Sequence, residues 1–381
     1  MDFKTDYRLE DYILDTTWES LPEAVRERAR GCALDLIGAL TLGSQGKQFR
    51  CGVSLAESFI AEGDIPIVGS EKTFNLLGGA IAMGHSANSF DIDDGHNMIK
   101  GHPGASFAAG LFTAAAKENI SFKDFLTALV IGYDVAVRTG LAIQEDYGFL
   151  HSTGTYGAVA TAAVMGRILG FTKEQMNNAL SLADFHAPLT PVMRSVEYPS
   201  MCKDGVPFGS LTGAMAVLET LAGSTGKTYT LESGDERYLL DDLGRNYEIM
   251  NLYFKPYTCC RWAHQPIRAI IDIMGAESFG HEEVEKVLVH TFDSAARLSK
   301  KRPIDTEEAQ YNIAWPVASA IVHGEVGYLQ MCDAAVGTET VLSMMNRLSF
   351  VVDPELDCQF PEKRLAWVEI ELKDGRVFKS K

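Results

Sequence analysis

Most of the chain shows the spacing of apolar residues that is typical of helices. Four apolar residues fall on one face over residues 20–42, which we expect to form the first long helix. Ser20 begins a Ser-Leu-Pro-Glu run with the pattern of a capping box, and this predicts the start of that helix. Similar boxes at Ser121 and Thr172 predict helices that extend to about residues 143 and 183.

Two other stretches, residues 151–169 and 209–223, are rich in alanine and glycine and predict buried helices that pack closely. After about residue 265 the pattern changes, and alternating runs with β-branched residues predict strands. These runs are residues 284–292, 348–352 and 366–378, the last around an Asp-Gly turn that is typical of a hairpin.

The predicted fold class is therefore mainly α, with two domains in a chain of 381 residues. Residues 1–265 are expected to form a large all-α domain that carries most of the active site. Residues 266–381 are expected to form a smaller α+β lid domain with an antiparallel sheet. The two domains are expected to touch, because no flexible linker is visible near residue 260.

Composition narrows the classes of function. The chain is 46% hydrophobic and 22% charged, which is typical of globular proteins. Its formal net charge of −17 argues against nucleic-acid partners and anionic membrane surfaces, but not against a small anionic substrate. No apolar run suggests a membrane span, and the acidic N-terminus shows no export signal. The seven scattered cysteines predict reduced thiols and a cytoplasmic location.

Residues 81–105 combine dense polarity with flanking apolar helical segments. Three histidines and three aspartates lie in this stretch: His85, His96, His102, Asp91, Asp93 and Asp94. Because burying unpaired charge is costly, these side chains must be solvated, paired or functional. They are compatible with a metal site, with acid–base chemistry by a histidine that an aspartate orients, or with aspartates that stabilise a helix terminus. The stretch has no HExxH or comparable ligand spacing, so we expect no metal.

Within this stretch we interpret His85 and Asp93 as structural and His102 as functional, because nothing about packing demands an imidazole between Gly101 and Pro103. His151 is a second candidate, since it precedes a helix of small residues whose N-terminus suits an anion. Ordinary helix capping explains the serine and threonines that follow it.

Cationic residues in two later segments can hold carboxylates. Lys203 precedes an apolar, glycine-rich helix, although a lysine there can also extend to solvent. Four basic residues follow near the domain junction: Lys255, Arg261, His264 and Arg268. Arginine gives bidentate contacts to carboxylates, so this cluster is a candidate carboxylate clamp. We interpret Cys259, Cys260 and Trp262 as packing residues. The chain has no glycine-rich phosphate loop and no GxSxG nucleophile motif.

Four segments together resemble the MmgE/PrpD family, which includes 2-methylcitrate dehydratase, cis-aconitate decarboxylase and iminodisuccinate epimerase. These segments are SANSFDIDDGHNMIKGHPGA, LHSTGTYGAVATAAVMGRILGF, MCKDGVPFGSLTGAMAVLETLAGSTG and FKPYTCCRWAH. Their order and spacing follow the family from about residue 20 to the end of the sequence. The resemblance implies a helical domain plus an α+β lid, a homodimer, and catalysis without a metal or organic cofactor.

The resemblance also implies roles for individual residues. His102 and His151 match the family's two active-site histidines, and Asp91 matches the first aspartate of its DFDD motif and would support His102. Lys203 and Lys255 match lysines that hold substrate carboxylates. We add Arg261 and His96 as candidate substrate-binding residues.

The sequence departs from the family pattern at two positions and at its end. Gly95 stands where the decarboxylases often have threonine, and Trp315 stands where the family has an active-site tyrosine. Family chains also usually continue past the final hairpin into helices that return to the large domain, whereas this sequence ends at Lys381. The departures at Gly95 and Trp315 argue against cis-aconitate decarboxylation.

The leading hypothesis is a lyase or isomerase that removes a proton α to a carboxylate of a small di- or tricarboxylate, like 2-methylcitrate dehydratase. Decarboxylation and epimerisation share the carbanion-like intermediate and stay open as alternatives. Two rivals from other classes also stay open. One is a metal-dependent hydrolase that uses His85, His96 and His102 with the aspartates, and the other is a homologue that binds carboxylates without catalysis.

Overall fold

The computed structural model describes residues 7–59 and 62–380, and the chain divides into two compact domains. The first domain comprises residues 1–89, 93–193 and 202–254. The second comprises residues 90–92, 194–201 and 255–381. Its main segment starts at residue 255. The sequence pattern predicted that the second domain starts at residue 266. The predictions about an N-terminal export signal and about the end of the chain fall partly on residues 1–6 and 381, outside the described residues.

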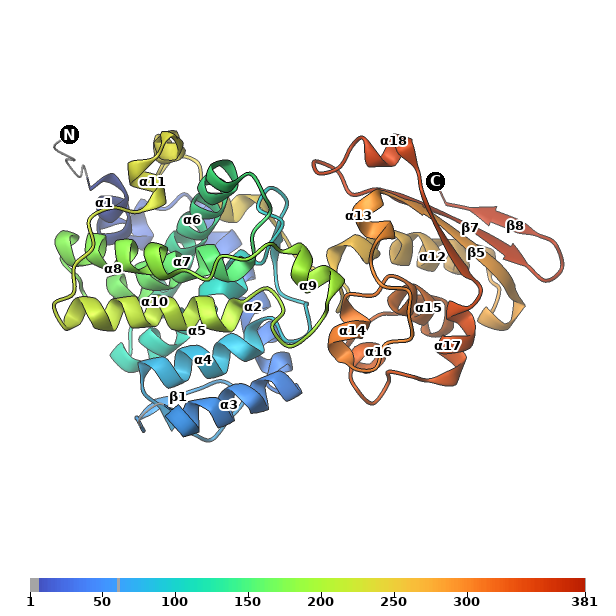
Figure 1. The fold of residues 1–381 in the computed structure, drawn as a ribbon, viewed down its shortest axis with the longest axis horizontal. Helices are drawn as coiled ribbons and strands as arrows, with labels where there is room; N and C mark the ends of the chain where they lie inside the picture. The colour runs from blue at the N-terminus through green and yellow to red at the C-terminus, as the bar shows by residue number, and fades with distance from the viewer. Residues whose placement is uncertain (1–6, 60–61, 381) are drawn as a thin grey trace. The chain divides into compact units, whose positions relative to one another are not determined.

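The first domain is built almost entirely from helices, as the spacing of apolar residues predicted (Figure 1). Its helices are α1 (Arg8–Asp15), α2 (Glu23–Gly43), α3 (Lys47–Phe59), α4 (Leu76–Ala87), α5 (Pro103–Glu118), α6 (Phe122–Tyr147), α7 (Thr153–Ile168), α8 (Lys173–His186), α10 (Val206–Leu221) and α11 (Thr230–Ser233). Two pairs of two-residue strands join them: β1 (Ile65–Pro66) with β2 (Thr73–Phe74), and β3 (Gly95–His96) with β4 (Leu252–Tyr253).

Two of the three predicted capping boxes lie at helix starts. Ser121 accepts a hydrogen bond from the Asp124 amide at the start of α6, and Thr172 forms a complete box with Gln175 at the start of α8. The prediction at Ser20 is wrong. Pro22 is the N-cap of α2 and has no side chain that can cap, whereas Ser20 closes a separate 3₁₀ turn together with Thr17.

Helix α6 is the long central helix of the first domain. Its length and composition would allow it to cross a membrane, which the sequence analysis did not anticipate. In the structure 94% of its most apolar window is buried. The apolar surface of α6 is therefore used for packing against neighbouring helices.

Helices α7 and α10 pack with their backbones in close contact, as their alanine and glycine content predicted. A Cβ atom on Gly154 would lie 2.3 Å from the carbonyl oxygen of Gly205, and one on Gly209 would lie 2.4 Å from the carbonyl oxygen of Gly154. Both distances are too short for any side chain other than hydrogen. The contact brings the N-terminal ends of the two helices together, with the Gly154 amide donating to the Asp204 carbonyl at 2.8 Å.

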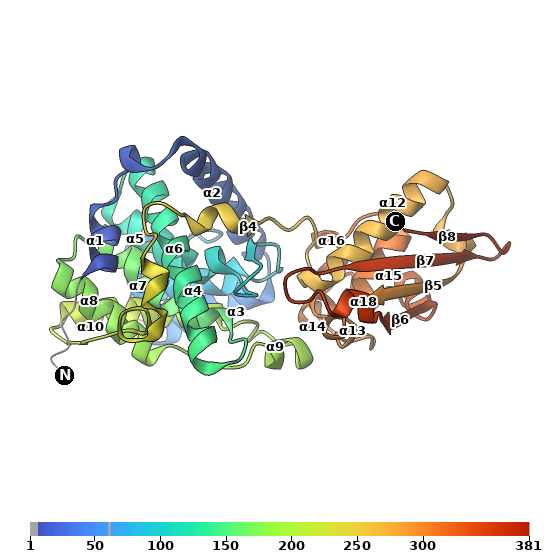
Figure 2. The same cartoon turned by 90° about the horizontal axis from the view of Figure 1, so that it is seen from above.

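The second domain combines helices with a four-stranded sheet in the order β6-β5-β7-β8 (Figure 2). Its strands are β5 (Val284–Thr291), β6 (Leu348–Val352), β7 (Ala366–Leu372) and β8 (Val377–Lys379). Its helices are α9 (Met193–Glu197), where the chain enters this domain, α12 (His264–Glu277), α13 (Asp293–Ala296), α14 (Thr306–Gln310), α15 (Ala314–His323), α16 (Tyr328–Met331), α17 (Glu339–Met345) and α18 (Pro354–Asp357). The mainly α fold with a small sheet region is confirmed.

The sheet is mixed, although the sequence suggested an antiparallel one. β7 pairs antiparallel with β5 and β8, and the Asp374-Gly375 hairpin forms as predicted. β6 pairs with β5 in parallel. The connection from β5 to β6 passes through α13–α17, and such a long crossover allows two strands to run in the same direction.

Candidate active site

His102 stands at the entrance of α5, where it is the N-cap residue and Pro103 occupies the first helical position. The preceding loop is closed by a hydrogen bond from the His96 amide to the Gly101 carbonyl at 3.1 Å. The His102 amide donates to the hydroxyl of Thr153 on α7 at 3.2 Å. The backbone of His102 is thus tied to α7, and the residue is 8% exposed.

The His102 imidazole is placed between two buried carboxylates. Its Nδ1 lies 2.8 Å from Oδ2 of Asp93, and its Nε2 lies 3.4 Å from Oδ2 of Asp204. The Asn88 amide donates to Oδ1 of Asp93 at 2.7 Å and lies 3.2 Å from Nδ1. A carboxylate at Nδ1 fixes the orientation and tautomer of a histidine and presents Nε2 for proton transfer.

This geometry corrects the interpretation of Asp93 as a structural bystander. Asp93 is fully buried and forms the short hydrogen bond to His102 that was expected of Asp91. Asp94 does stabilise a helix terminus, since its carboxylate accepts from the Gly104 amide in the first turn of α5 and from the Tyr133 hydroxyl. Burial raises the pKa of Asp94 to about 6, although these hydrogen bonds oppose the rise.

Asp91 belongs to the second domain and adopts a left-handed backbone conformation with φ of 53°. Its carboxylate forms an ion pair with Lys255 at 3.0 Å, and the same ammonium group donates to the Asp91 carbonyl at 3.0 Å. Both side chains are buried. The structure therefore pairs two predicted site residues, Asp91 and Lys255, with each other. The prediction was that Asp91 would support His102.

The other cations near Lys255 differ in their surroundings. The charges of Lys255 and Arg261 both act on Cys259 and His264, so these two cations lie in one part of the second domain. Burial, reinforced by these cations, lowers the pKa of His264 to about 3, which removes it as a cationic carboxylate ligand. Arg268 is on the exposed face of α12. Cys259 is buried, and burial raises the pKa of its thiol, consistent with packing.

Lys203 is buried just before α10 and has a positive φ of 41°. Its ammonium group donates to the carbonyl oxygens of Asn88 and Ser89. Asn88 therefore contacts Lys203 through its backbone and the Asp93–His102 pair through its side chain. This arrangement places a cation and an acid–base histidine around the same residue of the first domain.

His151 is in a different environment from His102. Its Nδ1 lies 3.1 Å from the Ser152 carbonyl and its Nε2 lies 3.0 Å from the Gly140 carbonyl. Its ring packs edge-on against Tyr156. Burial lowers the pKa of His151, and its two backbone contacts only partly oppose this. Because main-chain oxygens face both ring nitrogens, the structure gives His151 no carboxylate partner among the described contacts of its ring.

The serine and threonine after His151 do not act only as helix caps. Ser152 is the N-cap of α7 but makes no capping hydrogen bond through its side chain. The Thr153 hydroxyl accepts from the His102 amide and from Tyr156, and it donates to Asp204 at 3.3 Å. Asp204 and Thr153 are thus neighbours of His102 that the sequence analysis missed. The available signal was their position directly after Lys203 and beside Ser152 in the motifs that carry the family resemblance.

Gly95 and Tyr253 face each other across the β3–β4 pair. A Cβ atom on Gly95 would lie 2.4 Å from the tyrosine oxygen, so Tyr253 occupies the space into which a side chain at position 95 would point.

The next residue, His96, contacts an acidic side chain, and its Nε2 lies 3.6 Å from Oε2 of Glu248. Burial opposes ionisation of Glu248, but hydrogen bonds from His96 and Asn251 outweigh it and lower the carboxyl pKa.

The histidines of the metal hypothesis have separate partners in the described structure. His85 lies in α4 against Gly52 of α3, and burial lowers its pKa to about 4. His96 contacts Glu248, and His102 contacts Asp93 and Asp204. Trp315 is a core residue of the second domain, where its indole donates to the Gln330 carbonyl at 3.1 Å.

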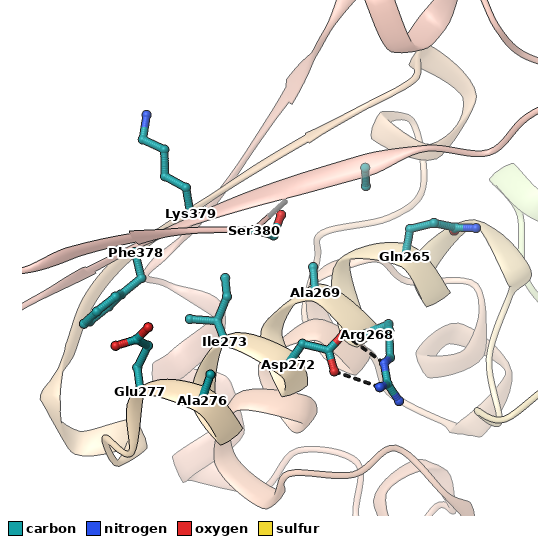
Figure 3. A pocket seen from close by; sticks show the side chains of 11 residues that line it. Gln265, Arg268, Ala269, Asp272, Ile273, Ala276, Glu277, Phe378, Lys379 and Ser380 are labelled. Carbon is teal, nitrogen blue, oxygen red and sulfur yellow. Dashed lines mark hydrogen bonds and ion pairs between the residues drawn. The ribbon is translucent and has the colours of Figure 1, made fainter.

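A cavity of about 570 Å³ lies in the second domain between α12 and the strands β7 and β8 (Figure 3). Its mouth carries Arg268 and Asp272, which form a two-point ion pair with distances of 2.8 and 3.0 Å. Of the predicted catalytic and substrate-binding residues that the structure describes, none is among those lining this cavity. The arginine is more than half exposed, so this ion pair contributes little to stability.

Comparison with known proteins gives two family matches. The MmgE/PrpD N-terminal domain matches residues 7–240, and the MmgE/PrpD C-terminal domain matches residues 257–381. A cis-aconitate decarboxylase of Aspergillus terreus is 25% identical over 338 residues, which cover 80% of this chain and 69% of that protein. A 2-methylcitrate dehydratase of Escherichia coli K12 is 21% identical over 406 residues, which cover 97% of this chain and 82% of that protein.

Proposed function

Because the chain belongs to the MmgE/PrpD family, we propose that it is a cofactor-independent lyase or isomerase that acts on a small di- or tricarboxylate. The reaction begins with removal of a proton α to a carboxylate. Dehydration like that of 2-methylcitrate dehydratase is the leading possibility, since that relative matches along 97% of this chain. Decarboxylation is the second candidate, because the cis-aconitate decarboxylase has the higher identity. Epimerisation uses the same intermediate.

The observation that carries this proposal is the buried His102–Asp93 pair. A histidine whose Nδ1 is held at 2.8 Å by a fully buried carboxylate is oriented for proton transfer through Nε2. Acid–base groups held in this way contribute about 10²–10⁴-fold to rate. The pair lies at the N-terminus of α5, whose positive potential also favours an anionic substrate.

Lys203 supplies the first domain's part of substrate recognition in this proposal. Its buried ammonium group donates to the carbonyl oxygens of Asn88 and Ser89, beside the Asp93–His102 pair, and a cation at this place is suited to binding a carboxylate. Such a cation also stabilises the negative charge that develops when the α-proton leaves. We propose carboxylate binding for Lys255 and Arg261 as well, by resemblance to the family. His96 stays a predicted substrate-binding residue.

The test is proton exchange at the α-carbon. The protein is incubated in deuterated water with a panel of di- and tricarboxylates, and NMR follows deuterium incorporation and product. We expect exchange with the wild-type protein and a loss of at least about 100-fold in H102Q, because Nε2 of His102 would deliver the deuteron to the α-carbon. H186Q serves as a matched control, because His186 is exposed at the end of α8.

The outcomes separate the rival classes. Binding of a carboxylate without exchange by the wild-type protein would identify a non-catalytic homologue. Exchange that depends on a stoichiometric metal in the purified protein would favour the hydrolase class. We further propose a cytoplasmic homodimer, and a monomeric mass by light scattering at micromolar concentration would contradict that part.

A further inference from the structure

Asp204 approaches the nitrogen of His102 that a catalytic role requires. Its Oδ2 lies 3.4 Å from Nε2, and its side chain is 4% exposed. The hydroxyl of Thr153 donates to the same oxygen at 3.3 Å, and Tyr156 donates to that hydroxyl at 3.1 Å. The His102 ring is therefore flanked by one carboxylate at each nitrogen.

This placement restricts the protonation state of the imidazole. The 2.8 Å contact with Asp93 assigns a proton to Nδ1, which donates to the carboxylate. In a neutral imidazole Nε2 would then carry a lone pair that faces the oxygen of Asp204, and two acceptors would oppose each other. A second proton on Nε2 turns that opposition into an ion pair, and two nearby carboxylates favour the cationic ring.

The position of Asp204 is set by the backbone. Its carbonyl accepts from the Gly154 amide at 2.8 Å, in the close contact between α7 and α10. Its contact with His102 is longer than the one made by Asp93, so the proton on Nε2 is held less tightly than the proton on Nδ1 and can pass to a substrate. Other charged or titratable groups near His102 in the described structure include Asp94, whose charge acts on it, and Tyr156, whose hydroxyl lies beside its backbone. They also include Lys203, a cation that donates to the carbonyl of Asn88 and opposes the effect of the carboxylates.

We propose that Asp204 is a positioning residue that keeps the His102 imidazole doubly protonated, so that His102 performs the acid step of the reaction. In a dehydration the Nε2 proton passes to the hydroxyl oxygen of the carbanion intermediate. The C–O bond breaks with its electron pair on that oxygen, the carbanion pair forms the C=C bond, and water leaves. His102 becomes neutral and regains a proton from solvent. In a decarboxylation the same proton passes to the carbanion carbon.

The protonation state is measured without substrate, so it is tested separately from the proposed function on which the acid step rests. The full chain is labelled with ¹⁵N-histidine, and the His102 signals are assigned by their loss in H102Q. We expect an imidazolium at pH 7 in the wild-type protein. In D204N we expect the midpoint of the His102 titration to fall by about one pH unit or more. D204E retains the charge and is expected to keep the midpoint close to that of the wild type.

D241N is the matched control, because it removes an exposed carboxylate of the same domain that pairs with Arg8. An unchanged midpoint in D204N, or a shift of equal size in D241N, would overturn the proposal. If D204N does not fold, the spectrum of the wild-type protein is the test. A neutral His102 at pH 7 in that spectrum would also overturn the proposal. With an active substrate, the alkaline limb of the kcat/KM profile is expected to move to lower pH in D204N. If no substrate is turned over while the titration shifts, only the proposed function fails.

Discussion

The surroundings of His102 and of His151 show how two similar sequence signals lead to different chemistry. Both histidines precede helices of small residues, and both are buried. The ring nitrogens of His102 face the carboxylates of Asp93 and Asp204. Those of His151 face backbone carbonyls of Ser152 and Gly140. The difference shows that the charge of the neighbours, and not burial, separates the two sites.

The carboxylates around His102 and the neutral carbonyls around His151 have opposite effects on the protonation of the two rings. Carboxylates stabilise a cationic imidazole and so make proton transfer possible near neutral pH. Neutral carbonyls in a buried site do not offset the free energy needed to remove a charge from water. The pKa of His151 is lowered for this reason. On this basis we expect His102 to be the acid–base group, and we expect His151 mainly to connect the start of α7 to α6 through its contact with Gly140.

The largest expected effect comes from removing the carboxylate at Nδ1. In D93N the neutral amide no longer stabilises the oriented, charged form of His102, and we expect turnover to fall about 10²–10⁴-fold with an intact fold. Steady-state kinetics and circular dichroism measure the two properties. Activity within tenfold of wild type in a folded D93N would remove the distinction between the two histidines.

A smaller effect is expected at the other histidine. In H151Q the glutamine keeps a donor for one of the two carbonyls, so we expect kcat to stay within about tenfold of wild type. The lost hydrogen bond should lower the free energy of unfolding by about 1–3 kcal/mol. Urea unfolding and steady-state kinetics on the same preparation test this. A loss of turnover as large as that of H102Q would show that His151 takes part in the chemistry after all.

The smallest effect concerns the dependence of stability on pH. The folded state lowers the pKa of His151, so the unfolded chain binds more protons between the two pKa values. The contribution of His151 to the free energy of unfolding is therefore fully present above the pKa of about 6.5 in the unfolded chain. It is lost as the pH falls below that value. We expect the free energy of unfolding to decline less steeply from pH 7 to pH 5 in H151Q than in the wild type. H186Q should retain the wild-type slope, and an equal slope in H151Q would refute the assignment.

Local rules predicted much of the fold. The starts of α6 and α8 followed from capping residues, and all four strands of the sheet followed from alternation and the Asp374-Gly375 turn. The parallel pairing of β5 with β6 did not, because partners about sixty positions apart leave no local signal. The start of α2 was misplaced because Ser20 caps a different, shorter turn.

The candidate site was predictable in its motifs but not in its contacts. His102 was identifiable from its position between glycine and proline. The carboxylate that reaches it is Asp93 because the backbone turns at Asp91, whose φ is 53°, and spacing along the sequence does not reveal such a turn. The partner of His151 is a carbonyl on another helix, which only the packing of α6 against α7 brings close.

The contact between α7 and α10 has a consequence for how such a site can diversify. Gly154 and Gly209 already carry the smallest possible side group, so the spacing between Thr153 and Asp204 can only widen by mutation. Side-chain changes are therefore easier to accommodate elsewhere in the first domain. Gly95 and Tyr253 are suited to this, because a larger residue at one position can be accommodated by a smaller residue at the other. The backbone contact between α7 and α10 would thus keep Thr153 and Asp204 at a fixed spacing beside His102 while other positions change.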